Sequence, residues 1–248
     1  MEINEIKKNA FSMPYTCPSA IKINYQFKNR EYLSIDYESD INILREIVPQ
    51  PLKVINPIVK FQFINMPDAT GFGEYKSVSQ LIEVELNGKT GLYAYNMYLD
   101  NLAPIAAGRE IWGFPEKLGT PNLKVESDTI LGTLNYNSIR VAIGTMGYKY
   151  KELDKNLIKE YFHTTPNYLL KIIPDVNLQT SCICQLIEFY YKDVNIIGAW
   201  SGPATLQLFN HALAPVSYLP IKKIISAQHI ISDLTLGFGE IIYDYLEK

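Results

Sequence analysis

The stretch that decides the fold is GREIWGFPEKLG, residues Gly108–Gly119. It combines an Arg-Glu pair, two aromatic side chains, a proline between glycines and an adjacent Glu-Lys pair. A plain core strand does not need so many polar and special-backbone residues, whereas loops that carry chemistry concentrate them. Glycine permits backbone conformations that other residues avoid, proline fixes one torsion, and aromatic rings can keep a pocket dry. The stretch therefore predicts a functional loop.

Lys117 in this stretch is a candidate amine nucleophile. A free lysine has a pKa of about 10.4 and is protonated at neutral pH; lowering that pKa to about 7 costs the ammonium form about 4 to 5 kcal/mol, which burial among apolar side chains can supply. The neighbouring carboxylate of Glu116 acts in the opposite direction, because it favours the ammonium form. The alternative interpretation is a surface lysine beside a surface glutamate.

The stretch resembles the active-site segment of the acetoacetate decarboxylase family. The resemblance continues in order along nearly the whole chain, in Asn29–Tyr32, Met97–Asn101, Thr145–Lys149, Pro166–Pro174 and Ala199–Ala212. It implies a β-barrel-like cone around the site, assembly into homo-oligomers, and a small keto acid as substrate. In this family a lysine activated by desolvation or by a neighbouring cation attacks the ketone and forms an iminium that accepts the electrons released with CO2.

The chain departs from the family at the nucleophile. It has Pro115-Glu116-Lys117 where the family has Pro-Lys-Lys, so Glu116 occupies the place of the attacking lysine. Arg30 matches the family's arginine, whereas Gln62 and Ser77 align with its two glutamates. The formal charge of the set remains zero. Because an unpaired buried charge is costly, we expect Glu116 to pair with Arg30.

Two geometries are open for the Glu-Lys pair. Neighbouring side chains of an extended segment point to opposite sides, so in the family register Glu116 faces the cavity and Lys117 points away. A slip of one residue near Gly113 or Gly119 brings Lys117 in. The predicted catalytic residues are Lys117, Glu116 and Arg30. The predicted substrate-binding residues are Phe114, Met97, Gln62 and Ser77.

Composition limits the classes of partner. The 248 residues are 47 % hydrophobic, and the net charge of -3 gives no basic surface for nucleic acid or an anionic membrane. Three cysteines and three histidines offer no convincing metal set, so we expect no metal or cofactor. No signal peptide or membrane span is apparent. We expect a reduced, cytoplasmic protein that forms one domain over residues 1–248.

The alternation of apolar and polar residues predicts mostly strands. Alternating runs joined by Asn87-Gly88 indicate a hairpin over 78–98, and a second pair is expected over 129–146. Asp40 and Asp154 are candidate caps for short helices over 41–48 and 155–162. Further strands are expected at 22–37, 58–66, 168–173, 182–191, 194–200 and 206–210, with a final segment over 224–245. This is a β-rich α+β chain, and we expect a closed sheet around a pocket.

Three functions follow from the resemblance and its departure. The first is decarboxylation of a small β-keto acid such as acetoacetate through a Schiff base, with Lys117 as the amine and Arg30 near the carboxylate. The second is Schiff-base aldol or dehydration chemistry, as in related proteins of the superfamily, with Glu116 as general acid or base. The third is a non-catalytic binder of small ligands that has lost the amine.

Overall fold

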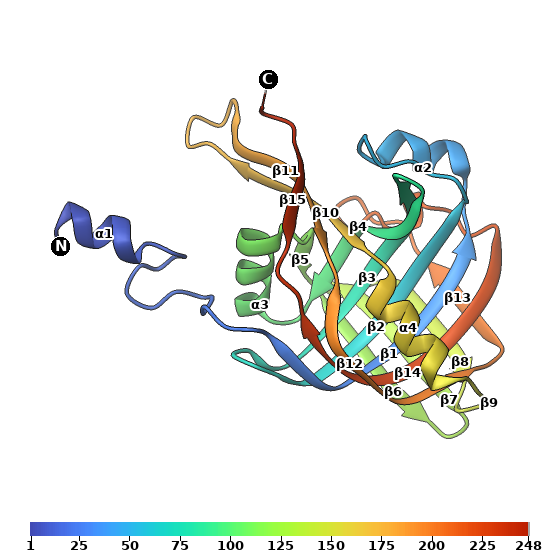
Figure 1. Cartoon of the computed structure of the whole chain (residues 1–248). Helices are drawn as coiled ribbons and strands as arrows, with labels where there is room; N and C mark the ends of the chain where they lie inside the picture. Colours follow the sequence, from blue (N-terminus) through green and yellow to red (C-terminus); the bar gives the residue numbers. More distant parts are fainter. Residues whose placement is uncertain (248) are drawn as a thin grey trace.

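A computed structural model of the chain describes residues 1–247 and consists mainly of two β-sheets (Figure 1). The larger sheet has eleven strands, ordered β15-β11-β10-β4-β3-β2-β1-β14-β12-β9, and β5 pairs with β4. Its strands are β1 (Gln26–Glu38), β2 (Ile58–Ala69), β3 (Gly73–Leu86), β4 (Lys89–Leu99), β5 (Glu116–Leu118), β9 (Lys151–Glu152), β10 (Asn167–Pro174), β11 (Ser181–Phe189), β12 (Tyr191–Ser201), β14 (Lys223–Leu236) and β15 (Glu240–Asp244). The smaller sheet, ordered β13-β8-β7-β6, contains β6 (Thr120–Glu126), β7 (Thr129–Tyr136), β8 (Ile139–Gly147) and β13 (Ala204–Leu208).

The helices are short. They are α1 (Ile3–Asn9), α2 (Ile41–Ile47), α3 (Leu102–Ala107), α4 (Lys155–Thr164), the π-helix η1 (Gly108–Trp112) and the 3-10 helix η2 (Val216–Tyr218). The expected caps are confirmed, since the carboxylate of Asp40 accepts from Asn42 N at 2.9 Å and that of Asp154 accepts from Asn156 N at 2.8 Å. Both interactions satisfy a free N–H of the first helical turn. The pattern of apolar and polar residues in the sequence did not predict α1, α3 or η1. Helix α1 lies away from the sheets in Figure 1.

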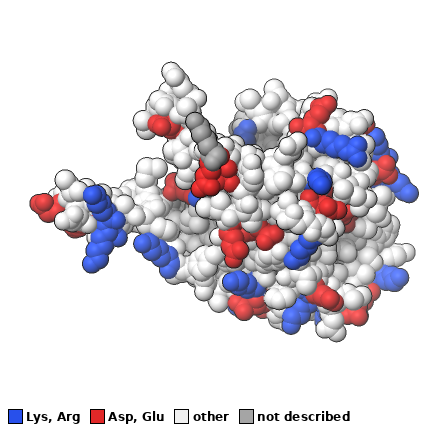
Figure 2. Space-filling view, turned by 45° about the horizontal axis from the view of Figure 1, so that its top comes forward, with Lys and Arg blue, Asp and Glu red and all other residues white. Residues whose placement is uncertain are grey.

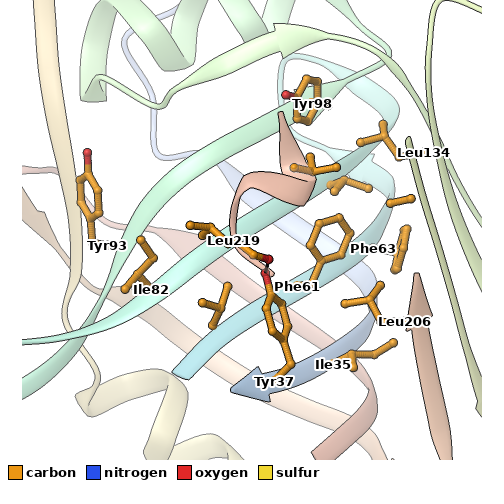
Figure 3. Close-up of a cluster of buried hydrophobic side chains, with 14 of the residues drawn as sticks. Ile35, Tyr37, Phe61, Phe63, Ile82, Tyr93, Tyr98, Leu134, Leu206 and Leu219 are labelled. Atoms are coloured by element: carbon orange, nitrogen blue, oxygen red, sulfur yellow. Dashed lines mark hydrogen bonds between the residues drawn. The ribbon is translucent and has the colours of Figure 1, made fainter. Parts of the chain in front are cut away.

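Both faces of the larger sheet are largely buried. Successive side chains along each strand point to opposite faces. On β1, Leu33, Ile35 and Tyr37 face the smaller sheet and belong to one core cluster. Figure 3 shows this cluster, in which the Tyr37 hydroxyl donates to Leu219 O at 3.2 Å. Arg30, Tyr32 and Ser34 face the other side of the same strand, where the cavities lie. Both faces of β1 are covered although its sequence mixes apolar and polar residues, because the face toward the cavities carries polar as well as apolar side chains.

The two sheets approach closely where glycines of β7 and β8 meet aromatic side chains of β2. A Cβ at Gly132 would overlap the ring of Phe63, and one at Gly144 would lie 2.7 Å from the same ring. Phe61 and Phe63 fill this interface with ring centroids 5.2 Å apart. The interface therefore fixes how β2 presents its opposite face to the cavity.

The hairpins predicted from Asn87-Gly88 and from residues 129–146 are confirmed as β3-β4 and β7-β8. Asn87 and Gly88 have φ of 52° and 79°, the two positive values that a type I′ turn requires. The predicted closed barrel is not confirmed. In residues 1–247 the larger sheet ends in two edge strands, β15 and β9, that do not pair with each other. The sheet curves around a pocket without closing.

The surface carries no dominant sign of charge on the face in Figure 2, where basic and acidic side chains are interspersed. Ion pairs also link charged side chains of neighbouring strands. One joins Lys28 of β1 to Asp233 of β14, whose charged atoms are 3.8 Å apart. This distribution accords with the net charge of -3. In residues 1–247, no helix is both long and apolar enough to cross a bilayer.

Candidate active site

A cavity lies on the concave side of the larger sheet, and residues from nine strands contribute to its wall. The polar members are Arg30, Gln62, Tyr75, Ser77, Ser79, Glu116, Asn167, Tyr168 and Tyr191. The remaining lining side chains are apolar, and include Ile64, Met66, Met97, Leu99, Phe114 and Phe189. The space open to the centre of a water molecule is about 70 Å³, well above the roughly 10 to 15 Å³ that a single water needs. A small organic molecule fits such a space.

Glu116 lies in the wall of this cavity and is only 6 % exposed. It is placed there by β5, which runs parallel to β4 with Glu116 opposite Met97. Its Oε2 has no hydrogen-bond partner in the described chain. Burial raises the pKa of Glu116 well above its usual value, and the nearby positive charge of Arg109 offsets only part of this effect. Burial therefore favours the neutral form of this carboxyl group over the charged form.

The π-helix η1 and the turn after it set the position of β5. Gly113 ends η1 with φ of 86°, a left-handed conformation that suits glycine, and its N–H donates to Gly108 O at 2.9 Å. Arg109 Nη1 then donates to the carbonyl of Glu116 at 3.1 Å. Arg109 thus holds the backbone of Glu116 from outside the cavity.

Arg30 lies in the same cavity and is 7 % exposed. Its guanidinium carbon lies 5.0 Å from the ring centroid of Phe27, 4.9 Å from that of Tyr32 and 5.6 Å from that of Tyr191. Burial acts to lower the pKa of Arg30, and the hydroxyls of neighbouring tyrosines offset this, so its pKa lies above the usual value. Among residues 1–247 no carboxylate pairs with this cation. Aromatic faces stabilise it instead.

A bulge in β1 points Arg30 into the cavity. The register of β1 against β14 shifts between Phe27 and Arg30, and Asn29 has φ of 53°. Asn29 N donates to the carboxylate of Asp233 at 2.9 Å, which fixes this conformation. The bulge lets Phe27 and Arg30 share one face although they are three positions apart, an odd spacing that would place them on opposite faces of a regular strand.

The expected ion pair between Glu116 and Arg30 is wrong. The two side chains line one cavity, yet no ion pair joins them, and the charged neighbour that affects the pKa of Glu116 is Arg109. The Glu116 carboxyl lies against the backbone of Gly108 and not across the cavity. The charge of Arg30 is therefore free to bind an anion from outside.

Lys117 points away from the cavity, as alternation along an extended segment requires. Its Nζ donates to Leu213 O at 2.5 Å and lies 5.2 Å from the ring centroid of Tyr136. Of the two geometries left open by the sequence, the structure has the one in which Glu116 faces the cavity. In the described chain, no lysine is among the residues that line it.

The predicted substrate-binding residues Phe114, Met97, Gln62 and Ser77 all line the cavity. Gln62 accepts from Ser79 Oγ at 3.2 Å and donates to Ser34 Oγ at 3.4 Å. The hydroxyl of Ser77 is buried without a partner in residues 1–247.

Four further polar residues of the cavity wall were not predicted as site residues: Tyr75, Ser79, Asn167 and Tyr191. Ser79 could have been found, since it lies two residues after Ser77 on one strand and so shares its face. Asn167 and Tyr191 come from distant strands that only the fold brings near. Within residues 1–247, no group of three or more histidine, cysteine, aspartate or glutamate side chains is arranged to hold a metal.

Together these features define a class of protein with a curved β-sheet that encloses a small-molecule site, where one buried cation and one buried carboxyl group line an apolar pocket. Comparison with known proteins identifies the family. The model of the acetoacetate decarboxylase family matches residues 12–246. The chain belongs to this family.

Individual relatives agree with the family assignment. The acetoacetate decarboxylase of Bordetella avium is 51 % identical over 249 residues and that of Burkholderia multivorans 52 % identical over 249 residues, with all of both chains covered in each case. A solved structure of acetoacetate decarboxylase superposes with a TM-score of 0.95 at 46 % identity and covers 100 % of both chains. The fold is thus that of acetoacetate decarboxylases.

Proposed function

We propose that this protein decarboxylates a small β-keto acid such as acetoacetate in the cavity that contains Arg30 and Glu116. The observation that carries the proposal is that one apolar cavity is lined by a guanidinium without a carboxylate partner in the described chain and by a buried carboxyl group whose pKa is raised. The cation suits the substrate carboxylate, and the acid suits the ketone oxygen. The relatives at about half identity are named acetoacetate decarboxylases, which supports the same reaction.

Glu116 provides the acid catalysis in this proposal. Arg30 binds the carboxylate, and the Glu116 hydroxyl donates a hydrogen bond to the ketone oxygen. When the bond to the carboxylate carbon breaks, its electron pair moves toward the ketone oxygen, which takes the proton of Glu116 and becomes an enol. The enol carbon then takes a proton from water while its hydroxyl proton returns to Glu116. One CO2 leaves and one proton is taken up overall.

An amine route through Lys117 is the alternative mechanism for this reaction. It requires β5 to shift by one residue, which carries Lys117 Nζ away from Leu213 O and brings it into the cavity. The same shift moves Glu116 out, because neighbouring side chains of a strand alternate. The two mechanisms therefore exclude each other, and they can be separated by chemical trapping.

The experiment is an assay of acetoacetate for CO2 and acetone, together with borohydride reduction and peptide mapping, on the wild type, Glu116→Gln and Lys117→Met. Acid catalysis predicts that the wild type and Lys117→Met are active, that Glu116→Gln has lost most of its activity, and that no adduct forms. An adduct on Lys117, lost in Lys117→Met together with activity, shows the amine route. Absence of CO2 from the wild type contradicts the proposed function.

A second function is a non-catalytic binder of small carboxylates, which is favoured by the lack of a lysine among the residues lining the cavity of the described chain. Binding of acetoacetate without CO2 release identifies it. Aldol or dehydration chemistry in the same pocket is separated by its products, since it consumes an aldehyde or releases water and not CO2.

We further propose that residues 1–248 act as one domain, that the protein forms homo-oligomers, and that it works in the cytoplasm. Three free cysteines, two of them exposed, support a reducing compartment. Sedimentation of the purified protein tests the assembly.

A further inference from the structure

A second cavity adjoins the proposed active site. The two cavities share five lining residues: Gln62, Leu81, Leu92, Asn167 and Tyr191. The space open to the centre of a water molecule in the second cavity is about 40 Å³, which also exceeds the roughly 10 to 15 Å³ that one water needs. A substrate confined to the first cavity leaves this space unused.

A row of polar side chains crosses the sheet at one level and joins the two cavities. Gln228 of β14 pairs with Ser34 of β1, Ser34 with Gln62 of β2, and Gln62 with Ser79 of β3. Hydrogen bonds run from Ser79 to Gln62 and from Gln62 to Ser34. The hydrogen-bonded part of this row ends at Ser34. The side-chain amide of Gln228, at the outer end of the row, makes no hydrogen bond with any residue in the 1–247 range. This amide lines the second cavity and is free to bind a ligand.

Among the described residues, Lys60 is the one charged side chain that lines the second cavity, and its partner Asp36 lines the neighbouring outer groove. Lys60 Nζ lies 2.6 Å from the carboxylate of Asp36, which also accepts from Ser226 Oγ at 3.0 Å. The Lys60 ammonium lies 5.7 Å from the ring centroid of Tyr161 of α4. Burial acts to lower the pKa of Lys60, and the surrounding acidic groups offset this and raise it, so it remains a charged partner of Asp36. The lining of the second cavity, as far as residues 1–247 show it, therefore offers uncharged hydrogen-bonding groups and no free charge.

The second cavity lies between the proposed active site and the surface. Lys60, Leu92, Tyr161 and Gln228 also line an outer groove beside α4. A ligand whose carboxylate lies on Arg30 can extend past Gln62 toward this groove. The part that extends meets Gln228 and the aromatic side chains of the wall.

We propose that the second cavity is a subsite for the distal end of a keto acid that is longer than acetoacetate and ends in an uncharged polar group, a hydroxyl or an amide, bound by Gln228. This inference rests on the proposed function for the placement of the carboxylate and the ketone. It names the class of substrate that the site is built to select.

The test measures binding without turnover, using 4-oxo acids, whose carboxylate is one carbon too far from the ketone to leave as CO2. Calorimetry compares 4-oxoheptanoate with 7-hydroxy-4-oxoheptanoate on the wild type, Gln228→Leu and the control Gln207→Leu, which changes an exposed glutamine of β13. We expect the hydroxyl to tighten binding by about five- to tenfold in the wild type and the control. Gln228→Leu abolishes this preference.

Equal or weaker binding of the hydroxylated acid to the wild type overturns the inference, as does a preference that survives in Gln228→Leu. Turnover of acetoacetate tests the proposed function separately. CO2 release without a preference for the hydroxyl leaves the function and removes the subsite. A preference that depends on Gln228, without CO2 release from any 3-oxo acid, leaves the subsite and removes the function.

Discussion

The Glu116 carboxyl lies directly against the Cα of Gly108, so a Cβ at residue 108 would overlap Glu116 Oε2. Gly108 begins the π-helix η1, and Glu116 begins β5. The absence of a side chain at residue 108 leaves room for the acid at the wall of the cavity. Position 108 of the site stretch thus determines where the acid at position 116 lies.

Gly108→Ala should displace the Glu116 carboxyl, since the backbone of Gly108 is helical and only the added methyl group conflicts. Overpacking of this kind costs about 1 to 3 kcal/mol in the free energy of unfolding. We expect that loss in urea denaturation, together with at least a tenfold fall in kcat, since proton transfer by a positioned acid contributes about 10²- to 10⁴-fold.

The matched control is Gly147→Ala, where the nearest atom to a new Cβ is 3.3 Å away, on the flexible side chain of Tyr150. It should leave kcat unchanged. Full activity in Gly108→Ala would show that Glu116 does not need this position.

The stability of the protein should fall as pH rises because of Glu116. Its pKa is raised in the folded state, so above the pKa of the unfolded chain the folded protein holds a proton that the unfolded chain has lost. The penalty starts near pH 4.5, the ordinary value, and grows until pH reaches the folded pKa.

Glu116→Gln keeps the shape of the neutral acid without its titration. We expect the variant to be more stable than the wild type at pH 8 and equal to it near pH 4, as measured by thermal unfolding over that range. A constant difference in Tm at all pH values would rule out Glu116 as the titrating group.

The activity of the wild type should also decrease as pH rises through the raised pKa of Glu116, since the proposed step uses the protonated acid. Glu116→Gln should lower kcat by about 10²- to 10⁴-fold and remove this limb of the pH profile. Binding of a 4-oxo acid should change much less. Lys117→Met, whose amine lies outside the cavity, is the control and should keep the wild-type profile. A profile that is unchanged in Glu116→Gln would assign the limb to another group.

Much of the fold is predictable because local rules decide it. Asn87 and Gly88 are residues that tolerate positive φ, so their turn and the register of β3 against β4 follow from the sequence. The caps at Asp40 and Asp154 depend only on a side chain and the next helical turn. The η1 helix has no such local signal, and its residues were predicted to form a loop.

The site was predictable as a set of residues but not as a geometry. Arg30, Gln62, Ser77 and Glu116 were identified through the family motifs, and all four line the cavity. The ion pair between Arg30 and Glu116 was expected from charge alone. The sequence could not show that Gly108 leaves space for the acid elsewhere, or that aromatic rings surround the cation, because these contacts depend on packing between distant strands.

Replacement of Arg30 should separate stability from binding. A buried cation without a carboxylate partner destabilises a fold, and the faces of Phe27, Tyr32 and Tyr191 offset only part of that cost. Arg30→Met keeps an apolar stem against these rings and removes the charge. We expect Arg30→Met to raise the free energy of unfolding by about 1 to 2 kcal/mol.

We also expect Arg30→Met to weaken the binding of a 4-oxo acid by about ten- to a hundredfold, since hydrogen bonds to a charged group are worth about 1.5 to 3 kcal/mol. Arg45→Met, at an exposed position of α2, is the control and should change neither quantity. If Arg30→Met is less stable than the wild type and binds the acid equally well, Arg30 is a structural residue. A cation that serves to bind an anion lowers the stability of the free protein, and its removal weakens the complex.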